Sequence, residues 1–210
     1  MKNLSKGYRI GPYTTSQTEL RDLTKAWVCI SLAFGILLSG FSLSSRGWDI
    51  VALLMSFIVA AITVGIGFIV HELSHKIIAQ RYGCQAEFRA FDNFLIIGIF
   101  MALFLRILIA APGAVMISGP VGKSRNGKIS MAGPTSNLAV ALGFLAVAVI
   151  FGHNIITYYG FFINSLLAGF NMLPVAMFDG RKIFEWNKAV WGILAVVAAV
   201  FVFISYNIPV

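Results

Sequence analysis

Long apolar runs constrain this chain more than any other feature of its sequence. Of its 210 residues, 59% are hydrophobic and only 11% are charged. A soluble globular domain carries about 45–50% apolar and about 25% charged residues. A helix that crosses the hydrocarbon core of a bilayer needs about 20 apolar residues. We therefore expect lipid to be the solvent for most of this chain.

The apolar runs predict an all-α polytopic membrane protein with about five to six transmembrane helices. Ser16 and Glu19 fit a capping box, so a helix should begin near residue 17 and continue into the first span. A further apolar segment, 94–120, contains Arg106 and helix breakers, and is expected to be re-entrant or a sixth span, with a short strand at 114–117. The five runs that are long enough to span are 26–43, 50–75, 135–151, 155–178 and 189–206.

The distribution of Lys and Arg predicts an orientation in the membrane. Segment 1–25 has five of these residues, and 76–92, 111–133 and 181–188 have three each. If segment 94–110 returns to the side from which it enters, every basic-rich connection faces the cytoplasm, as the positive-inside rule requires. We expect a multi-pass protein of the cell membrane, with a cytoplasmic N-terminal segment (1–25) and a transmembrane domain (26–206).

The formal net charge of +8 would suggest nucleic-acid binding in a soluble protein. Here the basic residues lie beside apolar runs, so anionic lipid headgroups are the expected partner. We expect contact with the lipid bilayer and none with nucleic acid, and we see no cleavable signal peptide.

His71, Glu72 and His75 are the sharpest chemical feature of the sequence. Residues four apart lie on one face of a helix, so both imidazoles can reach one zinc ion. Glu72 is then placed to accept a proton from the attacking water. Three ionisable residues in five positions of a membrane span cost about 2.5 kcal/mol or more each, which favours a functional role.

Two histidines leave a tetrahedral zinc ion in need of a third protein ligand and one open position. The chain has only eight acidic residues. Glu87 and Asp92 follow the motif in a connection where they are expected to be solvated, and the acidic residues nearer the N-terminus lie on the wrong side or in the wrong segment. Of the remaining Asp179 and Glu185, Asp179 is favoured, because His71 and Asp179 each lie about 20 residues into their runs and so reach a similar depth.

The sequence also resembles a known family. His71-Glu-x-x-His75 followed by Asn171-x-x-Pro174-x-x-x-x-Asp179-Gly is similar to the paired signature of the site-2 protease family of intramembrane zinc metalloproteases. Ala132-Gly-Pro-x-x-Asn137 resembles the pattern of the helix between them. The resemblance covers about residues 50–185.

The resemblance implies that His71, His75 and Asp179 bind one zinc ion and that Glu72 is the general base. It implies that Asn137 faces the site and helps to hold the substrate strand or to stabilise the oxyanion, and that Asn171 supports the broken helix or contacts the substrate. It also implies that 112–120 is a short membrane-embedded β-hairpin beside the active site. The chain resembles a minimal core of the prokaryotic or archaeal type. The expected function is that of a zinc metalloendopeptidase that cleaves transmembrane segments of membrane-protein substrates.

Two alternatives stay open at this stage. Another class of membrane zinc protease would take its third ligand from Glu185. A metal transporter or zinc-binding scaffold would use the histidines without proteolysis, although transporters usually place polar residues along several spans and here they concentrate at one depth.

Overall fold

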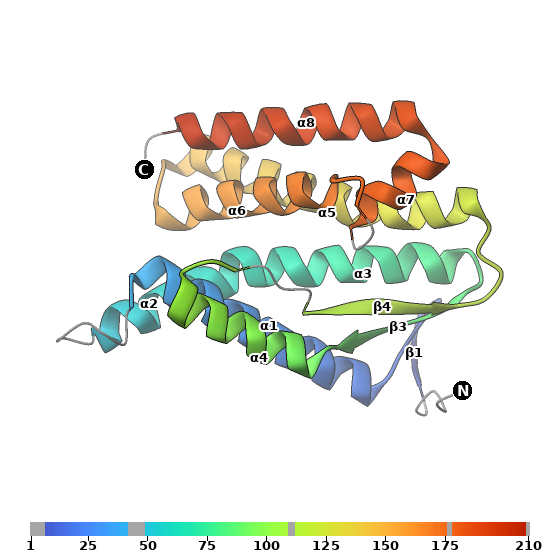
Figure 1. Cartoon of the computed structure of the whole chain (residues 1–210), viewed down its shortest axis with the longest axis horizontal. Coiled ribbons are helices and arrows are strands. Elements are labelled where there is room, and N and C mark those ends of the chain that lie inside the picture. Colours follow the sequence, from blue (N-terminus) through green and yellow to red (C-terminus); the bar gives the residue numbers. More distant parts are fainter. Residues whose placement is uncertain (1–6, 42–48, 109–111, 176–177, 209–210) are drawn as a thin grey trace. The chain divides into compact units, whose positions relative to one another are not determined.

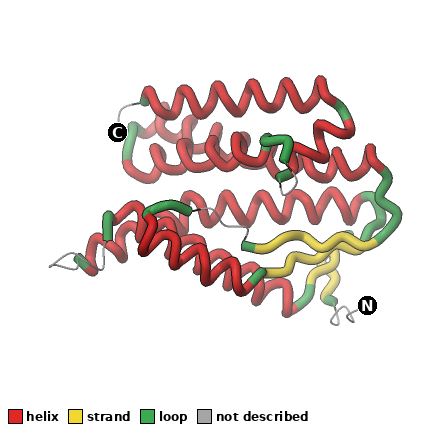
Figure 2. The backbone as a smooth tube through the Cα atoms, in the orientation of Figure 1, coloured by secondary structure: helices red, strands yellow, loops and turns green. Residues whose placement is uncertain are grey.

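The computed structural model describes residues 7–41, 49–108, 112–175 and 178–208, which are mostly helical (Figures 1 and 2). Within these described ranges, two two-stranded sheets accompany the helices, β1 with β2 and β3 with β4. In chain order the elements are β1 (Tyr8–Ile10), β2 (Tyr13–Thr15), α1 (Gln17–Ser39), α2 (Ile50–Ala60), η1 (Ala61–Gly65), α3 (Ile66–Arg81), β3 (Gln85–Ala90), α4 (Asp92–Phe100), η2 (Met101–Leu105), β4 (Gly113–Ser118), α5 (Lys123–Phe151), α6 (Ile155–Asn171), α7 (Asp179–Trp186) and α8 (Lys188–Asn207).

The chain divides into two compact units, which are described separately below. Unit 1 consists of Met1–Ile66 and Ala86–Met116. Unit 2 consists of Gly67–Gln85 and Ile117–Val210. The π-helical stretch η1 joins α2 to α3, so that Ile50–Arg81 is one uninterrupted helix.

Among the residues that the structure describes, four helices are long and apolar enough to cross a membrane: α1, the continuous helix Ile50–Arg81, α5 and α8. Four of the five expected spans fall on these helices. The remaining one, 155–178, falls on α6, whose 17 residues extend about 25 Å at 1.5 Å per residue, less than the hydrocarbon core of about 30 Å. The helices indicate a polytopic helical membrane protein, and the number of spans stays a prediction.

In unit 1, α1 begins where its capping residue predicts. The Ser16 hydroxyl accepts a hydrogen bond from the Glu19 amide. The Glu19 carboxylate, which we expected to reach back to Ser16, accepts from the Phe88 amide at 3.0 Å and from the Thr15 hydroxyl at 2.7 Å. Glu19 is fully buried, so these bonds offset the cost of removing its carboxylate from water and tie the start of α1 to β3.

The strand expected at 114–117 is present as β4, and it pairs with β3, which the sequence analysis did not predict. The two strands are separated in the chain by α4 and η2, which cover residues 94–105 of the apolar segment expected at 94–110; its last residues, 109–110, lie outside the described ranges. Arg106, which follows η2, has a left-handed φ of 54°. Residues 113–118 form a single strand that pairs with β3. The short β-hairpin expected at 112–120 is therefore not confirmed, and whether this region enters the membrane stays a prediction.

In unit 2, the helices α5 to α8 share one apolar core. Its buried members are Leu138, Ala168, Met172, Ile183 and Ala198. The indole of Trp191 on α8 donates a hydrogen bond of 2.8 Å to the carbonyl oxygen of Met172, which satisfies a backbone group at the end of α6. This packing holds α7 against α5 and α8.

Several helix boundaries differ from those of the expected spans, and one expected connection is a helix. Helix α5 begins at Lys123 rather than near 135 and contains Pro134. Helix α6 ends at Asn171 rather than at 178, and residues 176–177, like the end of the first expected span at 42–43, lie outside the described residues. The basic connection expected at 181–188 is mostly helix α7, whose one buried face packs on the core.

Candidate metal centre

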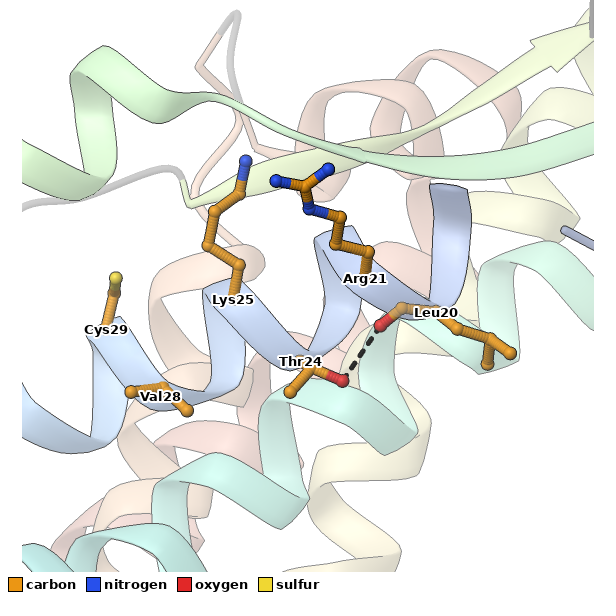
Figure 3. Close-up of a pocket in the computed structure, with 6 residues that line it drawn as sticks. All are labelled: Leu20, Arg21, Thr24, Lys25, Val28 and Cys29. Carbon is orange, nitrogen blue, oxygen red and sulfur yellow. Dashed lines mark hydrogen bonds between the residues drawn. The ribbon is translucent and has the colours of Figure 1, made fainter. Parts of the chain in front are cut away.

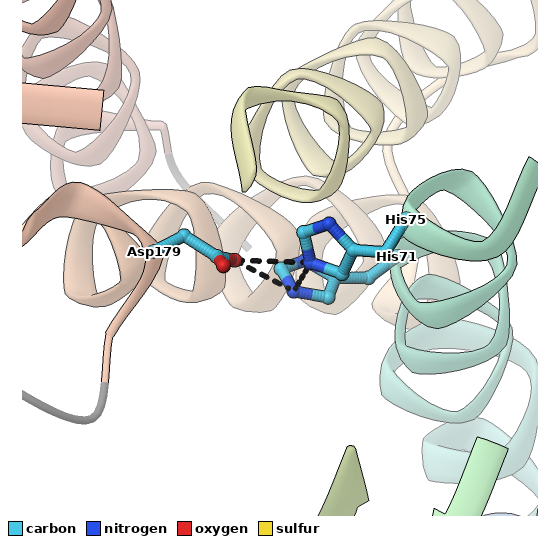
Figure 4. Close-up of side chains that lie close together, drawn as sticks. All are labelled: His71, His75 and Asp179. Carbon is cyan, nitrogen blue, oxygen red and sulfur yellow. Dashed lines mark hydrogen bonds and ion pairs between the residues drawn. The ribbon is translucent and has the colours of Figure 1, made fainter. Parts of the chain in front are cut away.

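Two imidazoles on α3 and one carboxylate on α7 converge within unit 2 (Figure 4). The Nε2 atoms of His71 and His75 lie 3.0 Å apart. The Oδ2 atom of Asp179 lies 3.4 Å from His71 Nε2 and 3.0 Å from His75 Nε2. All three side chains are nearly buried. Within the described ranges this is the one group of three or more such residues with ligand atoms close enough to hold a metal ion.

A break between α6 and α7 brings Asp179 to the histidines. Helix α6 ends at Asn171, before Pro174, which cannot donate a backbone hydrogen bond, and Asp179 begins a new helix. Gly180, the residue after Asp179, packs closely against the end of α6. A Cβ atom at this position would lie 2.3 Å from the carbonyl oxygen of Met172, so a larger residue would not fit. Asp179 thus lies in the first turn of α7, where the helix dipole favours a negative charge.

The electrostatic surroundings keep the Asp179 carboxyl group ionised. Burial by itself raises the pKa of this group, but the neighbouring imidazoles of His75 and His71 outweigh it and hold the pKa well below its usual range. The group is therefore an anionic ligand at neutral pH.

Hydrogen bonds determine which nitrogen of each histidine carries the proton. His75 Nδ1 lies 2.8 Å from the carbonyl oxygen of Ile129, and His71 Nδ1 lies 2.6 Å from Asn137 Oδ1. Both partners are acceptors, so each Nδ1 carries a proton, which leaves Nε2 as the nitrogen of each ring that can bind a metal. Both Nε2 atoms point towards each other and towards the Asp179 carboxylate.

Two imidazole Nε2 atoms and one carboxylate oxygen converge on one point, where a cation can bind to all three. Zinc binds imidazole nitrogen and carboxylate oxygen at about 2.0–2.2 Å, so the ligand atoms of a tetrahedral site lie about 3.3–3.5 Å apart. The three separations here, 3.0, 3.0 and 3.4 Å, are close to this value. Supporting hydrogen bonds at the outer ring nitrogens are also typical of zinc-binding histidines. The donor set therefore fits zinc.

The chain resembles two curated proteins of Methanocaldococcus jannaschii. It is 40% identical over 184 residues to one named "Putative zinc metalloprotease", a match that covers 85% of this chain and 90% of the relative. The chain belongs to this family of zinc metalloproteases. The second relative, named "Zinc metalloprotease", is 26% identical over 122 residues, covering 56% of this chain and 31% of the relative. No protein-family model matches the chain, and no solved structure matches it.

Membership in a zinc metalloprotease family implies zinc as the metal. His71, His75 and Asp179 form a possible site for it. Glu185, the alternative third ligand, is half exposed and pairs with Arg181 at 2.8 Å. The structure thus brings Asp179 to the histidines and leaves Glu185 on the exposed face of α7.

The other predicted site residues lie on α3, α5 and α6. Glu72 follows His71 on α3 and is half-buried. Asn137 is fully buried on α5, where its Nδ2 donates to the carbonyl oxygen of Gly67 and to Asn164 Oδ1. Asn171 is the last residue of α6, and its Nδ2 donates to the carbonyl oxygen of Leu167 at 2.9 Å. Asn137 therefore contacts the candidate ligand His71 directly. The side-chain hydrogen bond of Asn171 goes to the backbone of its own helix.

Sequence reasoning missed two residues that shape the centre. Asn164 lies inside an apolar run and is fully buried; a polar residue in a membrane-spanning run is often functional, and this signal could have identified it. Gly133 was recognised only as part of a pattern, yet its Cα faces both imidazoles.

A shallow pocket in unit 1 shares no residue with the metal centre (Figure 3). It lies along α1, where the Thr24 hydroxyl donates to the carbonyl oxygen of Leu20 at 2.9 Å. Its lining residues include no carboxylate or imidazole, and Lys25 pairs with Asp22 and Asp92. The pocket is therefore not a candidate for the metal.

We expect Gly133→Ala to lower zinc affinity by about 10–100-fold or more. A loss of about 10–100-fold is typical when groups that support metal ligands are disturbed. A Cβ atom at this position would lie 2.4 Å from His75 Nε2 and 2.6 Å from His71 Nε2, so both ligands must move. Zinc content after dialysis measures the effect. Gly143→Ala on the same helix is the control, because a Cβ atom there meets nothing within 4 Å. Wild-type zinc content in Gly133→Ala would contradict the assigned centre.

Proposed function

We propose that this protein is a zinc-dependent intramembrane endopeptidase of the site-2 protease type, which hydrolyses peptide bonds in the transmembrane segments of membrane-protein substrates. The main support is the position of the centre: two of its three ligands lie on a helix that is long and apolar enough to cross a membrane. Membership in a family of zinc metalloproteases supports zinc-dependent hydrolysis of peptide bonds as the reaction.

Each residue of the centre has a proposed part in catalysis. His71, His75 and Asp179 hold the zinc ion, which when bound lowers the pKa of water and polarises a carbonyl group. Glu72, next to His71, accepts the proton of the attacking water and passes it to the amine of the leaving peptide. Burial of the centre limits the access of bulk water and strengthens the electrostatic interactions within it.

The substrate must present an unwound segment to this centre, because the carbonyl groups of a transmembrane helix are engaged in hydrogen bonds. The strand pair β3–β4 offers backbone groups that could add a substrate strand. Asn171, beside the break between α6 and α7, is our proposed substrate contact. Asn137 was expected to contact the substrate, but its side-chain amide is buried and already hydrogen-bonded to His71 Nδ1 and to the carbonyl oxygen of Gly67. We therefore propose that Asn137 supports His71 instead.

The membrane arrangement forms part of the proposal. Five spans, with α6 as the fourth, would place the basic-rich connections, the N-terminal segment and the active-site side at the cytoplasmic face of the cell membrane. Substrate and lipid bilayer are the proposed partners.

Mapping the cleavage site tests the intramembrane assignment. Purified protein is reconstituted in liposomes with a single-span model substrate, and the products are identified by mass spectrometry. We expect cuts within the apolar segment of the substrate or at its edge. Cuts confined to the water-exposed parts, at the same rate as in a soluble unfolded peptide, would contradict the intramembrane assignment while leaving the zinc protease intact.

A further inference from the structure

Two fully buried asparagines, Asn137 on α5 and Asn164 on α6, lie behind the metal centre. A buried amide costs free energy unless its donors and acceptors are paired. Asn164 Nδ2 donates to the carbonyl oxygen of Gly160 at 2.8 Å, and Asn164 Oδ1 accepts from Asn137 Nδ2 at 3.1 Å. Asn137 Oδ1 in turn lies 2.6 Å from His71 Nδ1. The hydrogen bonds form one path from the backbone of α6 to a candidate zinc ligand.

The direction of each amide along this path is determined by its partners. The Gly160 carbonyl group can only accept, so it must face Asn164 Nδ2, which turns Asn164 Oδ1 towards Asn137. Asn137 Nδ2 also donates to the carbonyl oxygen of Gly67 at 3.2 Å. Rotating either amide by 180° would place oxygen against oxygen. Asn137 Oδ1 is therefore held towards His71 as an acceptor.

The two histidines differ in how they are held. His75 Nδ1 donates to the carbonyl oxygen of Ile129 in the backbone of α5, so its ring is oriented by the main chain. His71 depends on the side chain of Asn137, which depends on Asn164. A glycine makes room for this arrangement, since a Cβ atom at Gly67 would lie 2.0 Å from Asn164 Oδ1.

We propose that Asn164 and Asn137 form an asparagine relay (Gly160 O, Asn164, Asn137, His71 Nδ1) that positions His71, keeping its Nδ1 protonated and its Nε2 lone pair directed at the metal. Asn164 is a positioning residue that acts on His71 through Asn137. The proposal rests on the zinc site of the proposed function and adds the group that orients one of its ligands.

Zinc affinity, measured against a competing chelator in purified protein, tests the relay. Asn164→Ala removes the acceptor for Asn137 and is expected to lower zinc affinity by about 10–100-fold, as for other supporting groups around a metal. Asn164→Asp keeps an oxygen that accepts from Asn137 but places its second oxygen against the Gly160 carbonyl oxygen, which Asn164 Nδ2 now faces, so we expect it to weaken zinc binding as well. Gly67→Ala displaces the same amide from the other side and is expected to weaken zinc binding as Asn164→Ala does.

The control is Ser165→Ala, which removes an equally buried side chain whose hydroxyl donates to Phe161 O in its own helix. It should leave zinc affinity unchanged, whatever it does to thermal stability. A double-mutant cycle gives the sharper test: in an Asn137→Ala background, Asn164→Ala should cost little further affinity, because the path is already broken.

Full zinc affinity in folded Asn164→Ala, or an equal loss in both backgrounds, would overturn the relay while leaving the zinc site standing. A wild-type protein that binds no zinc would overturn the site itself, and the relay with it.

Discussion

Glu72→Gln is expected to keep zinc at the wild-type level and to slow cleavage by about 10²–10⁴-fold, the usual contribution of a general base. The amide has nearly the size of the carboxylate but cannot accept the proton of the attacking water. Glu72 is not among the three residues whose ligand atoms cluster, so the metal should be retained. Zinc per chain and the initial rate of cleavage of the single-span substrate are measured on the same preparation.

Glu185→Gln is the matched control for this variant, because it makes the same chemical change at a half-exposed residue that pairs with Arg181. We expect it to retain both zinc and activity. Undiminished cleavage by Glu72→Gln would show that another group accepts the proton and would remove Glu72 from the mechanism.

Asp179→Ala is expected to lose both zinc and cleavage. Its carboxylate lies 3.0 Å from His75 Nε2 and supplies the negative charge of the centre, and two neutral imidazoles alone leave zinc with half of a tetrahedral ligand set. Zinc content after dialysis and the cleavage rate report the two effects separately.

Glu185→Ala separates this assignment from the alternative third ligand. On our account it retains zinc and activity. If Glu185→Ala lost its zinc and Asp179→Ala kept it, the ligand would be Glu185, and the packing of α7 would have to differ from that described here.

The parts of the site that the sequence predicted follow from local spacing and from the rarity of polar residues in apolar runs. His71 and His75 share a helix face by their spacing of four, and Asp179 is one of few acidic residues at a suitable depth. The apolar runs likewise predict most of α1, α5 and α8 and the continuous helix Ile50–Arg81, because length and hydropathy need no tertiary information.

The missed elements depend on contacts that the sequence does not display. The N-terminal part of α5 contains Gly127, Gly133 and Pro134, which disfavour a helix by propensity, but close packing uses them. A Cβ atom at Gly127 would lie 2.4 Å from the Cβ atom of Trp186 on α7. Helix α7 itself is short and rich in charge, so it was interpreted as a basic connection. The buried face of α7 can be recognised only once the apolar core of unit 2, against which it packs, is known.

Asn137 and Asn164 show that contacts within the site, too, could not be predicted from the sequence alone. Asn137 was predicted to lie near the histidines, but its part could not be derived from the sequence. The partner that orients it, Asn164, lies 27 residues further along the chain, and only the fold brings the two amides together. Spacing identifies ligands on one helix; it does not identify groups that support them from another.

The central claim is most directly tested by restoring zinc to the metal-free wild-type protein while following cleavage of the single-span substrate in liposomes. Our account predicts no cleavage once zinc has been removed to background, and a return of activity that reaches its full value at one zinc ion per chain. Cleavage that continues at the original rate in the zinc-free protein would contradict the zinc-dependent mechanism. A protein that takes up one zinc ion per chain and still cleaves no transmembrane segment would contradict the proteolytic function.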